Sequence, residues 1–326
     1  MTVSQVSLAE FCGVSELPTL NPAVIAQQNA DAHWLVQDAQ GQVLARCSVW
    51  WRETPVYPAQ RLGLVGHYFA QSQYDSEQLL NAAEKQLAEH GCTLAIGPLD
   101  GNTWRSYRFV TERGSEPPFF LEPNQPAQWV DYFVERGYSP LAEYYSTLNT
   151  HLLHNELALA TLAQRLTQRD ISVRNFRMDD FDNELQRIYD VSVASFSKNF
   201  LYTPISQQEF LFSYSQLRAY CIPDLIFLAE QDGYPIGFLF ALPDWLQLRQ
   251  GQAIDTVIIK TLAVRPEWQM SGLGSLLLAR SEKTFHRFGY RRSIHALMHQ
   301  DNASRKMSGH TQSAFLRRYA LFAKAL

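Results

Sequence analysis

The chain has 326 residues, with a hydrophobic fraction of 46% and a charged fraction of 18%, as in an ordinary globular protein of about two domains. Its 28 Lys and Arg residues against 32 Asp and Glu residues give a formal net charge of −4, which excludes a strong field for nucleic acid or an anionic membrane. There is no signal-peptide pattern, no apolar run of about 20 residues and no C-x-x-C pair among the four cysteines. We therefore expect a cytoplasmic protein that spans no membrane and has neither a disulfide framework nor a metal site.

The first half of the chain is predicted to alternate strands and helices. The expected elements are a hairpin in 34–51, a strand at Leu62–Phe69, a helix from Ser76 to His90, a strand in 93–97, a helix in 127–137 and a strand in 141–148. The helix is expected to start after Asp75 and to stop at Gly91, since these residues suit helix ends.

Leucines at helical spacing in 152–167 predict a connector helix between two halves. The second half repeats the alternation. Its expected elements are helices in 179–196 and 207–217, strands in 225–233 and 235–242 joined at Asp232-Gly233, a strand in 256–264, a helix at Leu273–Phe288 and a strand in 292–299. If Gly91 is aligned with Gly289, each helix leads into a strand and a similar turn, which indicates an internal duplication.

Gly272 and Gly274 lie where the apolar strand ends and the last helix begins. Glycines at such a place indicate a sharp turn or a close approach to the backbone. The first turn of a helix has unpaired N–H groups at the positive end of its dipole, so a phosphate can bind there without a lysine. An ordinary glycine turn is the alternative. A Rossmann loop fits poorly because Leu277 takes the third glycine position, and a Walker loop is excluded because no G-K-[ST] is present.

The wider pattern favours a phosphate site. Gln269-x-x-Gly272-x-Gly274 matches Q/R-x-x-G-x-G/A, the acyl-CoA pyrophosphate loop of the GNAT N-acetyltransferase superfamily. The preceding TLAVRPEWQ resembles that family's fourth strand, and SGLGSLLLARSEKTFHRFGY resembles its third helix. The resemblance is strong over Leu225–Asn302 and extends from Val173 to the C-terminus.

The first half resembles a second, diverged GNAT domain. Its FVERGYSPLAEYYSTL is similar to the family's closing helix and strand, but Tyr74 and Ser76 take the places of the two glycines. The resemblance implies an α/β (α+β mixed sheet) fold of two tandem GNAT-like domains, each a central mixed twisted sheet flanked by helices. We expect a diverged domain without pyrophosphate loop at 1–150, a connector helix at 151–170 and the acetyltransferase domain at 171–326.

The resemblance also implies the donor site for acetyl-CoA, the acyl donor. The loop amides are expected to bond the pyrophosphate, and they belong to Gln269, Met270, Ser271, Gly272, Leu273, Gly274 and Ser275. The strand edge expected to pair with the pantetheine arm, and to supply an amide to the thioester oxygen, is formed by Leu262, Ala263 and Val264. Asn302 stands where the family's next helix begins.

The groups that move protons are less clear from the sequence. Many GNAT enzymes protonate the leaving thiolate with a tyrosine seven residues after the helix asparagine, but here that position is Gly309. His310 and Tyr319 are the nearby candidates for this catalytic role. An amine with a pKa of about 10.4 benefits from a base, and the candidates are Glu230 and Asp255, which suit solvated turns equally well.

The acceptor site is expected in the aromatic-rich segment 195–220, which in GNAT folds overhangs the acceptor. Phe196, Phe200 and Tyr202 are the candidates for its wall, with core packing as the alternative. Arg105 and Arg108 would meet a carboxylate if the first-half loops form a wall of the same cleft.

The expected function is transfer of an acetyl or other acyl group from acetyl-CoA to a primary amine of a small molecule, amino acid or protein, by direct attack. An acyl-CoA-binding sensor or scaffold without catalysis is one alternative. An aminoacyl or peptidyl transferase with a tandem GNAT-like fold is another. The sequence does not indicate the acceptor, the acyl chain length or the oligomeric state.

Overall fold

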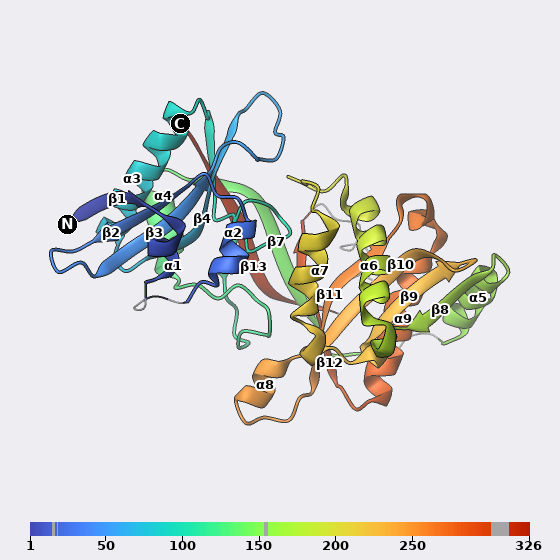
Figure 1. The fold of residues 1–326 in the computed structure, drawn as a ribbon. Helices are drawn as coiled ribbons and strands as arrows, with labels where there is room; N and C mark the ends of the chain where they lie inside the picture. The colour runs from blue at the N-terminus through green and yellow to red at the C-terminus, as the bar shows by residue number, and fades with distance from the viewer. Residues whose placement is uncertain (15–16, 18, 153–155, 301–312) are drawn as a thin grey trace.

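The computed structural model describes residues 1–326 apart from 15–16, 18, 153–155 and 301–312 (Figure 1). Strands of the first half are β1 (Thr2–Val6), β2 (Ala32–Gln37), β3 (Val43–Trp50), β4 (Leu62–Ala70), β5 (Leu94–Gly97), β6 (Phe109–Glu112) and β7 (Ser139–Asn149). Its helices are α1 (Leu8–Cys12), α2 (Pro22–Gln27), α3 (Gln73–Glu89) and α4 (Gln128–Glu135).

The second half has a parallel series. Its strands are β8 (Ile171–Asn175), β9 (Ile226–Gln231), β10 (Tyr234–Pro243), β11 (Thr256–Val264), β12 (Arg292–His299) and β13 (Ala314–Ala325). Its helices are α5 (Glu156–Thr167), α6 (Phe181–Phe196), α7 (Gln207–Ser215), α8 (Trp245–Arg249) and α9 (Leu273–Arg287). Short 3₁₀ turns are η1 (Met178–Asp180), η2 (Arg218–Tyr220), η3 (Pro223–Leu225) and η4 (Pro266–Ser271).

One 13-stranded mixed sheet runs through both halves. In each half three antiparallel pairings lead to a parallel pair, β4 with β5 in the first half and β11 with β12 in the second, and a helix connects the two strands of that pair. This repeated order is the duplication that the glycine alignment predicted. The fold is therefore a mixed α/β fold with two GNAT-like units in tandem.

The last strand of each half lies in the other half's part of the sheet. β13, at the C-terminal end of the chain, pairs with β5, and β7 of the first half pairs with β12. The two exchanged strands also pair with each other, and they run side by side from one half to the other (Figure 1). The predicted division at 1–150, 151–170 and 171–326 stays a prediction, and β13 crosses it.

Apolar side chains on alternate positions cover both faces of the second half of the sheet. On β9, Phe227 packs in a core with α9, whereas Leu228 packs in a core with α6 and α7. Such a two-sided core explains why β9, β10 and β11 read as nearly continuous apolar runs.

Most predicted elements are confirmed, but one helix start is wrong. α3 begins at Gln73 because the Ser72 side chain caps it by accepting from the Asp75 amide. Asp75 therefore lies inside the first turn, where the prediction had placed it before the helix. β1, β6, β8 and β13 were not predicted, and three of these four strands have only 4 or 5 residues.

Candidate functional site: a strand opening and an inter-half cavity

The parallel strands β11 and β12 separate partway along their length. They pair only between Thr256–Ile259 and Arg292–His295. Beyond that point, Leu262–Val264 pairs with β10 on one side, and no strand of the described chain pairs with its other side. This edge is the one expected to pair with a pantetheine arm.

Lys260 stands where the two strands begin to separate. The register between β10 and β11 shifts between Phe240 and Ala241, so that Thr261 and Ile259 have partners and Lys260 is the extra residue of a β-bulge. Bulges re-aim side chains and are frequent beside active sites. The Lys260 side chain faces a cavity, described below.

The predicted phosphate loop lies at the far end of β11, between that strand and α9. Gly272 is left-handed, with φ 87°, and is the N-cap of α9, which begins at Leu273. The Leu273 amide is bonded to the Ser271 hydroxyl at 3.1 Å. The next amides belong to Gly274 and Ser275 in the first turn of α9, where an α-helix has no partner for them of its own, and Ser275 is exposed. An anion can therefore reach them.

The connector helix α5 packs against this loop. A Cβ at Gly272 would lie 2.9 Å from the Leu162 side chain, and Arg165 donates to the Ser271 carbonyl at 2.8 Å. The glycine is thus required by its backbone angle and by the approach of α5, in addition to any ligand. Arg165 also brings a positive charge to the loop.

The equivalent helix start in the first half does not suit an anion. Tyr74 and Ser76 lie inside the first turn of α3, as does Asp75, which is 5% exposed. The Asp75 carboxylate accepts a hydrogen bond from Ser72. A fixed negative charge therefore occupies the positive end of this helix dipole.

A cavity of about 1000 Å³ lies between the two halves of the chain and reaches the β11/β12 opening. Strand β12 contributes Ala296, Leu297 and His299 to its lining, and β11 contributes Lys260. From the first half come, among others, Trp104, Tyr107, Arg108, Glu122 and Tyr144.

Several cavity residues have an unusual backbone conformation. Four non-glycine residues of the lining have positive φ, namely His67 (48°), Arg108 (70°), Leu121 (65°) and Leu297 (59°). Such angles are uncommon outside glycine and cluster at ligand sites, where surrounding structure holds them. These angles favour a ligand site over a packing gap as the role of the cavity.

The three predicted acceptor-wall residues, Phe196, Phe200 and Tyr202, all line this cavity. Phe196 and Tyr202 contact the Trp104 ring, with centroids 5.7 and 6.0 Å apart, and Phe200 lies 5.8 Å from the His299 ring. All three side chains are partly buried, so each ring can pack against its neighbours and also contact a ligand in the cavity.

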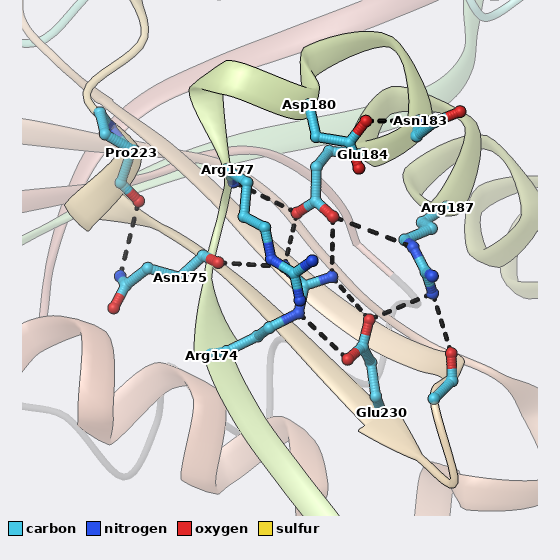
Figure 2. Close-up of polar contacts among 10 residues, drawn as sticks. Arg174, Asn175, Arg177, Asp180, Asn183, Glu184, Arg187, Pro223 and Glu230 are labelled. Carbon is cyan, nitrogen blue, oxygen red and sulfur yellow. Dashed lines mark hydrogen bonds and ion pairs between the residues drawn. The ribbon is translucent and has the colours of Figure 1, made fainter.

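Glu230, a predicted base, is held in a buried ion-pair network (Figure 2). Its carboxylate binds the Arg174 guanidinium at 2.6 Å and that of Arg187 at 3.2 Å, and Arg174 also binds Glu184 at 2.6 Å. Hydrogen bonds from the guanidinium to Glu184, the largest effect, and to Glu230 raise the Arg174 pKa further above its usual value despite burial. The network joins α6 to β8 and β9, so the geometry favours a structural role, and the predicted role of Glu230 as a base stays a prediction.

Asp255 lies at the other end of β11 from the predicted donor loop. Partial burial opposes its ionisation, but hydrogen bonds from Thr256 and Gln247 and the charge of Arg292 outweigh it, so the Asp255 pKa is below its usual value. Its backbone carbonyl accepts from the amides of Arg291 and Arg292. The geometry favours a structural role here too.

Tyr319 is fully buried on β13. Its hydroxyl bonds the Glu122 carboxylate and lies 3.0 Å from the Ser146 hydroxyl. Burial and the neighbouring carboxylate raise the Tyr319 pKa, which makes it a weaker acid for a thiolate. His310 and Asn302 lie outside the described residues, so their predicted roles stay predictions.

Two charged residues of the cavity, Lys260 and Glu122, were not among the predicted site residues. Lys260 interrupts the apolar run TVIIKTLAV, and this single charge was the feature that could have indicated it. No feature of the sequence indicated Glu122. Arg108 and Arg105 were predicted to meet a carboxylate, and both line the cavity, but Arg105 is already bound by Glu209 at 2.7 Å.

No three His, Cys, Asp or Glu side chains within the described ranges are grouped as a metal site. In the same part of the chain, no helix has the length and apolar content to cross a membrane.

Residues 185–307 match the family model of the GNAT acetyltransferases, and this range includes the strand opening, the bulge and the glycine loop. The chain carries a GNAT-family domain.

Two curated relatives are similar in sequence. Protein YghO of Escherichia coli (strain K12) is 22% identical over 75% of this chain and 68% of its own length. A bacterial ceramide synthase of Caulobacter vibrioides is 23% identical over 51% of this chain and 43% of its own length.

Solved structures share the fold along nearly the whole chain. A GCN5-related glucosamine N-acetyltransferase region of a fungal β-N-acetylglucosaminidase aligns over 99% of this chain and 38% of that one, with a TM-score of 0.56 and 13% identity. A tandem GNAT protein of the clavulanic acid pathway aligns over 99% of this chain and 98% of that one, with a TM-score of 0.50 and 11% identity. Because both alignments cover the first half of the chain, this half also has the GNAT fold.

Proposed function

We propose that the chain transfers an acyl group from acyl-CoA to a primary amine by direct attack, with acetyl-CoA as the first donor to test. The observation that carries the proposal is the β11/β12 opening, which has an anion-accepting helix start at one end and the inter-half cavity at the other. A donor lying along the Leu262–Val264 edge has its phosphates at α9 and its thioester at the cavity.

The reaction forms an amide bond and breaks the thioester bond. The amine nitrogen attacks the carbonyl carbon, CoA leaves as a thiolate, and the proton lost by the amine balances the one the thiolate takes up. At neutral pH an alkylamine with a pKa near 10.4 is mostly protonated, so bringing it to its free form costs about 4–5 kcal/mol. A cavity that carries positive charge lowers this cost, because it disfavours the protonated amine.

Two related functions remain as outcomes of the test. An acyl-CoA sensor or scaffold would bind the donor without turnover, and an aminoacyl or peptidyl transferase would not bind it. Because one relative is named a bacterial ceramide synthase, we leave the acyl chain length open. A CoA-dependent reaction also fits the cytoplasmic location expected from the sequence.

The test is an incubation of the purified protein with acetyl-CoA and a panel of primary amines, following free thiol release and acylated product by mass. Amine-dependent thiol release supports the proposal. Saturable acetyl-CoA binding with no release for any amine would favour the sensor.

A further inference from the structure

Two cations of the inter-half cavity, Arg108 and Lys260, are shielded from solvent and lack a carboxylate partner within the described chain, whereas Lys198 of the same lining is exposed. Among the described residues, neither Arg108 nor Lys260 takes part in an ion pair, although both line the cavity. Two other arginines of low exposure do have carboxylate partners, since Arg174 is paired with Glu184 and Arg317 with Glu122. Charges shielded from solvent normally have partners of opposite charge. Two such cations without a carboxylate partner therefore point to an anionic ligand.

Arg108 is held rigidly. It is 8% exposed, its guanidinium lies 3.8 Å from the Tyr107 ring centroid and 4.1 Å from that of Tyr144, and one N–H donates to the Leu297 carbonyl at 3.1 Å. A guanidinium has five N–H donors in a planar fork that suits a carboxylate. The two rings lie edge to face with each other, so they hold the guanidinium on two sides.

Lys260 extends the same positive region to the strand opening. Burial and the nearby charge of Arg108 lower the Lys260 pKa to about 8, although Glu122 acts in the opposite direction. Glu122 itself is bound by Arg317 at 2.8 Å and by Tyr319, so it does not neutralise both cations. Lys260 at the bulge is also the lining residue of β11, next to where the thioester would lie.

We propose that Arg108 and Lys260 bind a carboxylate of the acceptor, so that the acceptor is an amino acid, or a similar amine bearing a carboxylate, with an apolar side chain held by Trp104, Phe196 and Phe200. This proposal rests on the proposed function for the identity of the reaction, but the carboxylate site itself does not depend on acyl-CoA. A carboxylate at Lys260 keeps an α-amino group within a few bonds of the opening between the strands.

The test uses three matched pairs that differ only in the carboxylate: phenylalanine and phenethylamine, leucine and isoamylamine, and tryptophan and tryptamine. Each is titrated by calorimetry into the full chain without CoA. We expect at least one amino acid to bind about 10-fold or more tightly than its amine, as charge-assisted hydrogen bonds provide. Equal or tighter binding of every amine, or no amino-acid binding at millimolar concentration, overturns the proposal.

Lys260→Met is the decisive variant because it keeps the side-chain length and removes a half-buried charge. It should lose about 10-fold in amino-acid affinity, whereas the plain amine, which is itself a cation, should bind equally or more tightly. Lys198→Met is the matched control, since Lys198 also lines the cavity but is exposed, and it should have little effect. Equal losses in both variants would contradict a specific role for Lys260.

A pH series separates Lys260 from the other charged groups of the cavity. With 3-phenylpropanoate, which has no amine, affinity should be highest between about pH 6 and 7, where the ligand is ionised and Lys260 is charged, and should fall as the pH rises through about 8. All other charged or titratable groups of the lining are present in Lys260→Met, which should show no such fall: His67, Tyr68, Asp100, Arg105, Tyr107, Arg108, Glu122, Tyr144, Lys198, Tyr202, Tyr214 and His299. A fall that persists in Lys260→Met would overturn the assignment.

Failure of the proposed function gives a different pattern. If acetyl-CoA does not bind but the amino acids do, the carboxylate site stands and the acyltransferase reading fails. If acetyl-CoA binds and the matched pairs do not differ, the acyltransferase proposal stands and the carboxylate site fails.

Discussion

At the scale of single residues, charge decides which parts of the duplicated fold can hold a ligand. The start of α9 offers free amides and the nearby charge of Arg165, whereas the start of α3 already contains a buried carboxylate, Asp75. Both helices follow the same kind of strand. One donor site per chain is therefore expected.

Ser275→Glu tests that site without disturbing the fold. Ser275 is exposed in the first turn of α9, where an acidic residue stabilises a helix, so thermal stability should be unchanged or slightly higher. A carboxylate a few ångströms from the pyrophosphate should weaken acetyl-CoA binding by about 10-fold or more in calorimetry.

The control for Ser275→Glu is Tyr74→Glu, at the equivalent helix start of the first half. Tyr74 is 57% exposed, and its replacement should leave acetyl-CoA affinity intact. Gly272→Glu is less suitable, because its positive φ and the approach of Leu162 would strain any side chain there. Equal losses at Ser275 and Tyr74 would contradict a single donor site.

Lys260 also predicts a stability change with pH. Its folded pKa of about 8 lies below the usual 10.5, so the protonated form destabilises the fold, and stability recovers as the pH rises from about 8 to 10.5. Lys260→Met should raise the free energy of unfolding at pH 7 by about 1–3 kcal/mol, with the gain shrinking above pH 8. Denaturant unfolding at pH 7 and pH 9.5 measures this. An unchanged or lower stability at pH 7 would mean that the Lys260 charge is not destabilising in the fold.

At the scale of elements, β13 is held in the first half by ion pairs of very different burial. Arg317 and Glu122 are 2% and 1% exposed in their side chains, whereas Arg318 and Glu112 are 46% and 55% exposed. Both pairs join the same strand to first-half residues. They therefore form a natural comparison of buried and exposed pairs.

Glu122→Gln should destabilise the chain by about 3–5 kcal/mol, because it leaves the Arg317 charge buried without its partner. Glu112→Gln should cost less than about 1 kcal/mol, because its pair is screened by water. Thermal or denaturant unfolding of the two variants side by side checks this. Similar losses for both would show that β13 is not anchored through Glu122.

The sequence allowed most elements to be predicted but not their partners. The hairpin of β2 and β3 follows from alternation and a turn at Gly41, which has positive φ, and the glycine loop before α9 follows from its motif. The place of β13 in the sheet does not follow from the sequence. The alternation of side chains indicates which face of a strand is buried, but it does not indicate which strand lies beside it. The Arg108–Lys260 pairing was missed for the same reason, since 152 positions separate the two in the sequence.

At the scale of the whole molecule, the exchange of β7 and β13 makes the halves depend on each other. The first half lacks the strand next to β5 unless β13 supplies it, and the second lacks the neighbour of β12 unless β7 does. An unpaired edge at the centre of a sheet exposes both backbone groups and apolar side chains.

The exchange predicts a single cooperative unfolding transition for the full chain. Residues 1–150 expressed alone should show no cooperative thermal transition by circular dichroism, since β13 is missing. Adding 171–326 in trans should restore it. A fragment 1–150 that unfolds cooperatively by itself would show that the exchanged strand is dispensable.

The most direct test of the central claim, a single acyl-CoA site in the β11/β12 opening, is a calorimetric titration of the full chain with acetyl-CoA, with NADPH as control. We predict one acetyl-CoA per chain, no NADPH binding, and an acetyl-CoA affinity about 10-fold or more weaker in Ser275→Glu. No acetyl-CoA binding, or binding unaffected by Ser275→Glu, would contradict the claim and leave the glycine loop as a structural turn.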